Sequence, residues 1–114
     1  MVEMTRKSIA AKILEGLPEQ DILNQEYLIC YDFIGGRPNP TFYKNIHRIS
    51  WLTGSGGNLT QYSVYRTKSL KAAIAVHELC IRYGAMVQLY EVNETSPEQL
   101  LEKIDKAQIE EEES

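Results

Sequence analysis

Asp32 is the acidic side chain near the end of the apolar stretch YLICYDFIGG, residues 27–36. A single carboxylate binds a divalent ion weakly, because Mg²⁺ and Mn²⁺ need several oxygen ligands. A twofold dimer that placed both copies of Asp32 across its axis would supply two ligands and a site for magnesium or manganese. In a single chain, Asp32 could instead have a structural role at the end of the strand, where its carboxylate would accept hydrogen bonds from Gly35 or Gly36. The residue types leave a metal role in a dimer and a structural role both open, and they predict no other cofactor.

Aromatic rings beside basic side chains form a second candidate site. Rings on a sheet face near lysine and arginine can stack unpaired bases of RNA or single-stranded DNA. Rings in the same positions also pack against a helix or a second subunit. We expect one sheet face to present the rings of Tyr27, Tyr31, Tyr90 and either Tyr62 or Tyr65, near the bases Arg66 and Lys68.

Hydrophobic periodicity predicts the elements that must position these residues. Residues 27–34 are apolar on both alternating sets, which is typical of a central strand covered on both sides. Residues 58–68 alternate as one bent strand or as a short hairpin. The expected helices are 5–15, 41–53, 70–83 and one starting at Pro97; the expected strands are 27–34, 58–68 and 85–92.

The helix predicted over residues 70–83 carries an apolar stripe that we expect to face the core: Leu70, Ala73, Ile74, His77 and Ile81. Ser96, Pro97 and Gln99 form a helix start, with serine as N-cap and glutamine three positions on. Because Leu100, Leu101 and Ile104 give that last helix an apolar side, we expect it to dock on another surface.

The element order predicts one α+β domain with a ferredoxin-like sandwich, in which a helical layer covers one face of an antiparallel sheet. Residues 1–25 form an N-terminal helical extension, expected to be an appendage. Residues 26–92 form the core, and residues 93–114 form an acidic helix and tail. The other sheet face must be covered by a partner subunit, by the terminal helices or by a ligand, and we expect a homodimer through it.

Charge is divided unevenly along the chain, whose net charge is −4. Residues 93–114 hold eight acids against two lysines, a net charge of −6, and residues 26–92 hold seven bases against four acids, a net charge of +3. The tail either aids solubility or engages a basic surface or a protein partner. Because affinity for duplex DNA comes mainly from phosphate neutralisation, the negative total argues against strong DNA binding.

Two further features concern the cellular setting. No run of about 18 apolar residues is present, so we expect a soluble, intracellular protein without a membrane segment. Cys30 and Cys80 lack metal-ligand spacing and fit small buried side chains, and a disulfide between them stays open.

Two strand motifs carry a resemblance. YLICYDF ends in tyrosine-aspartate, and NLTQYSVY enters a strand through glutamine and continues with serine, valine and an aromatic residue. The pair resembles the small ferredoxin-like CRISPR-associated nucleases of spacer integration over roughly residues 26–92. The resemblance implies that Asp32 matches a metal-site aspartate and that Tyr62 to Tyr65 match a dimer-packing motif. The paired arginines often found after that aspartate are missing here, and members usually begin at the first strand.

The chain as a whole resembles small uncharacterised proteins of archaeal rod-shaped viruses, which implies a location in the host cytoplasm. We therefore expect a non-enzymatic protein that acts as a dimeric interaction module or associates with nucleic acid. The alternative is a metal-dependent nuclease that uses Asp32 from both subunits of a dimer.

Overall fold

A four-stranded sheet and four helices make up the described part of the chain. The computed structural model describes residues 7–35, 39–54, 58–61 and 63–113. The elements are, in chain order, α1 (Ile9–Glu15), β1 (Glu26–Asp32), α2 (Pro40–Thr53), β2 (Asn58–Gln61), β3 (Val64–Thr67), α3 (Leu70–Arg82), β4 (Met86–Val92) and α4 (Pro97–Glu113).

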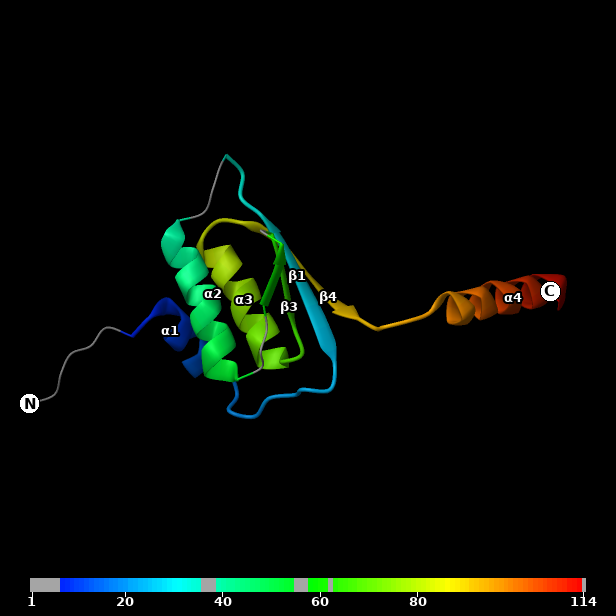
Figure 1. Cartoon of the computed structure of the whole chain (residues 1–114), viewed down its shortest axis with the longest axis horizontal. Helices are drawn as coiled ribbons and strands as arrows, with labels where there is room; N and C mark the ends of the chain where they lie inside the picture. The colour runs from blue at the N-terminus through cyan, green and yellow to red at the C-terminus, as the bar shows by residue number, and fades with distance from the viewer. Residues whose placement is uncertain (1–6, 36–38, 55–57, 62, 114) are drawn as a thin grey trace, which may run out of the picture.

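The strands form one antiparallel sheet in the order β2-β3-β1-β4. Helices α2 and α3 connect β1 to β2 and β3 to β4, and both lie on the same side of the sheet (Figure 1). This order and these connections give a ferredoxin-like α+β sandwich, as the sequence predicts. Residues 58–68 form the hairpin alternative, with β2 and β3 as separate strands.

The core helices begin and end where the sequence supplies the needed groups. The side chain of Asn39 accepts a hydrogen bond from the Thr41 amide at 2.9 Å, and Pro40 occupies the first turn of α2. Ser69 accepts from the Ala72 amide at 2.9 Å and so caps α3. Gly54 ends α2 with φ of 62°, a left-handed conformation that glycine adopts without steric cost.

The core lies between the helices and one face of the sheet. Along β1 the side chains of Tyr27, Ile29 and Tyr31 are buried under the helices, and Tyr65 and Thr67 continue this face on β3. The alternate residues of β1 point the other way and are only half-buried or exposed. A single chain therefore covers one face of β1, not both faces as the apolar run predicts.

Helix α1 belongs to the helical layer. It packs against α2 and α3, and Ala10 and Ile13 are buried in the core. The side-chain oxygen of Asn45, buried on α2, accepts a hydrogen bond from the Ala10 amide at 3.0 Å. The expectation of an N-terminal appendage outside the core is therefore wrong.

The side of helix α3 that faces the core is not the predicted stripe with Ile74, His77 and Ile81. The buried residues are Ala72, Ala73, Ala75, Val76, Leu79 and Cys80. Ile74 and Ile81 are exposed and His77 is half-buried. The helix is apolar around most of its circumference, and its alanine side is the one that fits closely between the sheet and the neighbouring helices.

Helix α4 stands away from the rest of the molecule (Figure 1). The molecule measures 74 × 36 × 22 Å, with a radius of gyration of 18.6 Å, against about 13 Å for a compact domain of this length. The Ser96 side chain caps α4 by accepting from the Gln99 amide at 3.2 Å, as predicted, whereas the Gln99 side chain accepts from the Thr95 hydroxyl. The sequence predicts that α4 docks on another surface. In the described part of the chain α4 does not pack against its own core. Among the described residues, no helix is long and apolar enough to cross a membrane.

Candidate functional site

The face of the sheet opposite the helices, here called the open face, carries an apolar set of side chains. The strand register places Leu28 beside Tyr90 and Cys30 beside both Val64 and Gln88. Met86 and Tyr90 are 63% and 45% exposed, and Leu28, Cys30, Val64 and Val92 are half-buried. An apolar surface built on a rigid sheet is suited to contact with a second protein surface.

Asp32 lies on this open face at the end of β1. It is exposed and pairs in register with Met86 on β4. A shallow hollow of about 310 Å³ beside it is lined by Cys30, Tyr31, Asp32, Met86, Val87 and Gln88. No group of three or more His, Cys, Asp or Glu side chains in the described part of the chain could hold a metal ion. One copy of the chain thus offers Asp32 without a second carboxylate beside it in the hollow.

The residues predicted to stack bases do not share a surface. Tyr31 is 4% exposed and Tyr65 is fully buried, because both point into the helical layer. Tyr62 lies outside the described residues. Arg66 and Lys68 are exposed. The stacking hypothesis is therefore wrong for Tyr31 and Tyr65, since a ring packed under a helix cannot present its face to a base.

Arg66 is engaged with an acidic side chain of the same sheet. Its guanidinium donates two hydrogen bonds to the Glu26 carboxylate, including one from Nη2 to Oε2 at 2.8 Å. This pairing lowers the pKa of Glu26, chiefly through the hydrogen bond from Arg66, and it raises the pKa of Arg66. A guanidinium held in this two-point geometry is less available to a phosphate.

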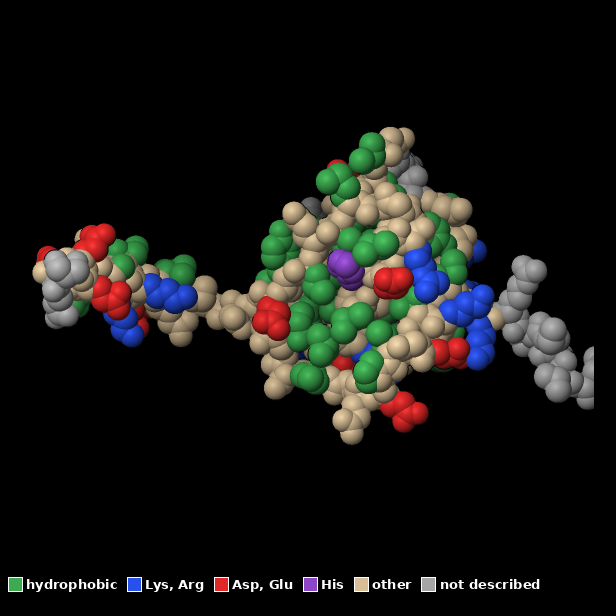
Figure 2. Space-filling view, turned by 180° about the vertical axis from the view of Figure 1, so that it is seen from behind, with side chains coloured by type: hydrophobic (Ala, Val, Ile, Leu, Met, Phe, Trp, Pro, Cys, Tyr) green, Lys and Arg blue, Asp and Glu red, His purple; other side chains and the backbone are tan. Residues whose placement is uncertain are grey.

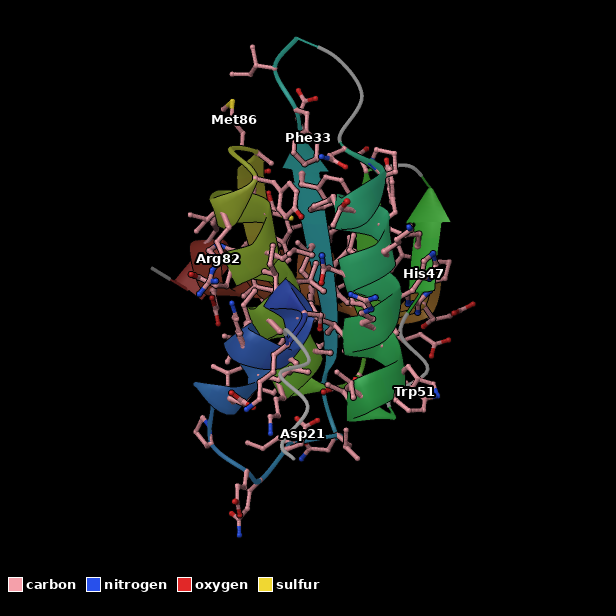
Figure 3. All side chains as sticks on the ribbon, turned by 90° about the vertical axis from the view of Figure 1, so that its left-hand side faces the viewer. Asp21, Phe33, His47, Trp51, Arg82 and Met86 are labelled. Carbon is pink, nitrogen blue, oxygen red and sulfur yellow. The ribbon has the colours of Figure 1, made fainter. Side chains whose placement is uncertain are left out.

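Tyr31 belongs to an aromatic cluster at the Asp32 end of the core. Phe42 lies at its centre, with the rings of Tyr31, Phe33, Tyr43 and Tyr83 at 5.0–5.5 Å from it in edge-to-face arrangements. Figure 3 shows Phe33 and Met86 near the same end of the molecule, opposite the end that carries Asp21. Burial raises the pKa of Tyr31 far above its usual value, and the ring lies in the core at 4% exposure.

The two cysteines lie on opposite sides of the sheet. Cys30 is half-buried on the open face, whereas Cys80 is buried on α3, and both are free thiols. Burial raises the pKa of the Cys80 thiol to about 12. The disulfide left open by the sequence is not formed, and the sheet separates the two side chains.

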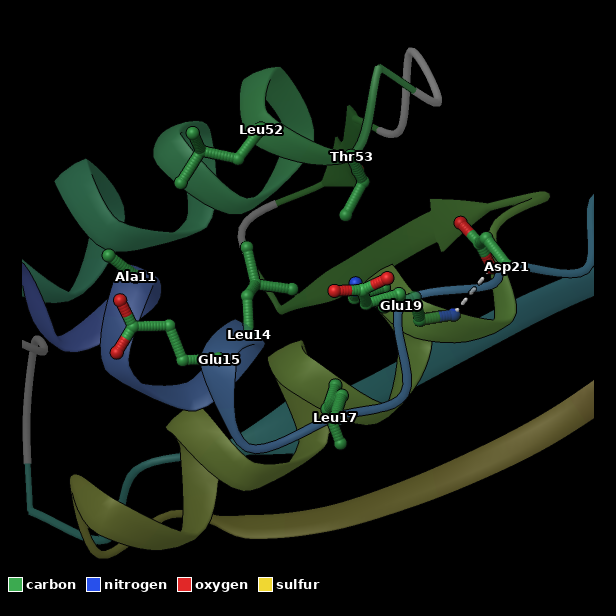
Figure 4. A pocket seen from close by; sticks show the side chains of 9 residues that line it. Ala11, Leu14, Glu15, Leu17, Glu19, Asp21, Leu52 and Thr53 are labelled. Carbon is green, nitrogen blue, oxygen red and sulfur yellow. Dashed lines mark hydrogen bonds between the residues drawn. The ribbon is translucent and has the colours of Figure 1, made fainter.

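The helical side of the molecule has a hollow of about 550 Å³ between α1, α2 and the start of α3 (Figure 4). Two of its acidic side chains, Asp21 and Glu15, are held by structural contacts. Asp21 accepts hydrogen bonds from the Ser69 hydroxyl and from the Lys71 amide, the latter at 2.9 Å, and Glu15 pairs with Lys7. Asp21 thus ties the segment before β1 to the start of α3, and the hollow presents no convergent set of groups for chemistry.

In comparisons with known proteins, no protein-family model, curated protein or solved structure matches the chain.

The sequence predicted an uncovered sheet face and a ring of Tyr90 on a sheet face, but it did not single out Met86, and it grouped Tyr90 with Tyr31 and Tyr65, which are buried. Met86 and Tyr90 alternate with Val87 and Leu89 along β4, and this pattern is apolar on both sides of the strand. The signal available was the absence of a polar face on an edge strand, since edge strands commonly carry charges that block association.

Proposed function

We propose that this chain is a non-enzymatic interaction protein that forms a homodimer through the open face of its sheet. The observation that carries the proposal is the difference in burial between the two sides of strand β1. Ile29 on β1 is fully buried within the chain, whereas its neighbour Leu28 lies on an apolar surface that the chain leaves uncovered.

The open face has the composition of an interface centre. Its middle contains Leu28, Cys30 and Val64, and an ion pair between Glu26 and Arg66 lies toward the start of β1. Protein interfaces commonly have an apolar centre and a polar rim. A twofold axis through this face would bury the same residues of both copies, as a self-complementary interface requires.

Base recognition is less well supported by the same residues. Tyr31 and Tyr65 are buried, and Arg66 is paired with Glu26. The chain is also net negative, which argues against strong binding to duplex DNA because that affinity comes mainly from phosphate neutralisation.

Sedimentation equilibrium of the wild type and of Tyr90→Glu tests the proposal. The wild type is expected to be a dimer, and the buried carboxylate of Tyr90→Glu should weaken association by at least about tenfold. Trp51→Glu is the matched control, because Trp51 is 80% exposed on α2, on the helical side (Figure 3). A monomeric wild type, or equal weakening by both variants, would contradict the proposal.

The second candidate is a metal-dependent nuclease, favoured by one observation. Asp32 is exposed on the open face, so a dimer through that face carries two copies of Asp32 on one interface. A cleavage assay on single-stranded RNA and on duplex DNA, with magnesium or manganese, compares the wild type with Asp32→Asn. Cleavage by the wild type that Asp32→Asn abolishes would establish the nuclease and overturn a non-enzymatic role, whereas no cleavage by either protein supports the interaction protein.

A further inference from the structure

We propose that α4 of one copy docks on the side of a second copy formed by α3 and β4. This surface, here called the α3–β4 flank, consists of Ile74, His77 and Ile81 on α3 and Leu89 on β4. The segment that docks is the α4 stripe, consisting of Leu100, Leu101, Ile104 and Ala107. The inference rests on the proposed homodimer and names a second contact within it.

The α4 stripe is an apolar surface that its own chain leaves uncovered. Leu100, Leu101 and Ile104 are 47%, 59% and 56% exposed. Their spacing, continued by Ala107, places them on one side of the helix. An isolated amphipathic helix of this length is marginal in water, so most of its stability must come from packing its apolar side on another surface.

The α3–β4 flank is the matching surface on the core. Ile74, Ile81 and Leu89 are 39%, 51% and 39% exposed. Leu89 lies on the helical side of β4, since it pairs in register with the buried Ile29. Figure 2 looks at the α3 and β4 side of the molecule and shows hydrophobic side chains gathered there, with both basic and acidic side chains beside them.

The lengths of the two elements match. Helix α4 has 17 residues and is about 25 Å long, close to the roughly 23 Å of the seven-residue strand β4. The flank itself carries both signs of charge, since Arg82 on α3 pairs with Glu78 and Glu91 on β4 is exposed. The contact therefore depends on the apolar side chains of the two surfaces.

The direction in which the chain leaves the core favours a second copy as the occupant. In Figure 1 the sheet lies between the helical layer and α4, so α4 extends on the side of the open face. Gln25 holds the start of this path by donating to the Val92 carbonyl at 3.0 Å and to the Asn93 side chain at 3.1 Å. When two open faces meet, α4 of each copy therefore extends alongside the body of its partner.

The size of the open face also calls for a further contact. Its four strands contain 22 residues in all, and at ordinary strand spacings the flat extent of such a sheet is on the order of 400 Å². Stable interfaces bury about 800 Å² of solvent-accessible surface on each partner. Docking of the α4 stripe on the α3–β4 flank adds area without any change in the core.

Hydrogen exchange of the full chain, followed by mass spectrometry at several protein concentrations, tests this contact. In the wild-type dimer the amides of residues 98–109 are expected to exchange at least about tenfold more slowly than in the diluted monomer. Ile104→Asp in the α4 stripe and Ile81→Asp in the α3–β4 flank should each abolish that protection. Ile109→Asp is the control on α4, because Ile109 is 53% exposed on the other side of the helix, and Trp51→Asp is the control on the core.

Sedimentation of the same samples separates this inference from the proposed function. A dimer whose α4 amides exchange as fast as those of the monomer overturns the docking and leaves the sheet-face dimer intact. Protection of α4 amides that persists at concentrations where the chain is monomeric shows that α4 folds back on its own core. That result overturns docking of α4 on a second copy. A chain that is monomeric at every concentration overturns both.

Discussion

The two faces of the sheet differ in how far the chain covers them. The face toward the helices holds Ile29 and Tyr65 with no exposed area, and Tyr27 and Tyr31 on the same face are also buried. The open face carries residues of similar hydrophobicity, such as Leu28 and Tyr90, which the chain leaves half-buried or exposed. The difference teaches that the amount of apolar surface in this chain exceeds what its own helices cover. The excess lies on the open face, on the α3–β4 flank and on α4.

The largest expected effect comes from truncating neighbours on β1 that point in opposite directions. Ile29→Ala leaves a cavity in the core and should lower the free energy of unfolding by about 2–5 kcal/mol. Leu28→Ala removes a half-buried side chain and should cost about 1 kcal/mol in the monomer. Urea unfolding at a concentration where the chain is monomeric measures both values. Equal losses would show that the two faces are equally buried in one copy.

A smaller difference in the free energy of unfolding is expected when the hydroxyl is removed from one tyrosine on each face. Tyr65 shares a partly buried hydrogen bond of 2.7 Å with the Ser50 hydroxyl, whereas the exposed Tyr90 hydroxyl donates to Gln88 at 2.8 Å. Tyr65→Phe should lower the free energy of unfolding by about 1 kcal/mol, and Tyr90→Phe should change it by less than about 0.5 kcal/mol. Unfolding curves of the two variants, recorded in parallel, check this order; a larger loss for Tyr90→Phe would contradict the assignment of the faces.

Local signals predicted the order and type of most elements. Ser69 and Ser96 lie at helix starts and glycines lie at helix ends, because capping depends on neighbouring residues alone. The apolar run of β1 and the order of elements were sufficient for the ferredoxin-like arrangement.

The side of each helix that is buried depends on distant residues, and here the sequence misled. Helix α3 is apolar over most of its surface, so hydrophobicity cannot tell its alanine side from the side with Ile74 and Ile81. Only the close approach of the sheet and of α1 and α2 selects the smaller side chains. The burial of Tyr31 and Tyr65 has the same origin, since the strand pattern shows which residues share a face and not which face the helices cover.

Covering of the open face in the dimer is the central claim, and the alkylation rate of Cys30 tests it most directly. Cys30 lies in the middle of that face, while Cys80 is buried in the core with a pKa of about 12 and serves as an internal reference that stays unreactive in the folded chain. Iodoacetamide labelling at pH 8 is measured by mass spectrometry across the concentration range in which sedimentation shows association. The account predicts that Cys30 labelling slows at least about tenfold as the dimer forms. A rate at Cys30 that stays constant while the chain dimerises would contradict it, because the dimer would then use another surface.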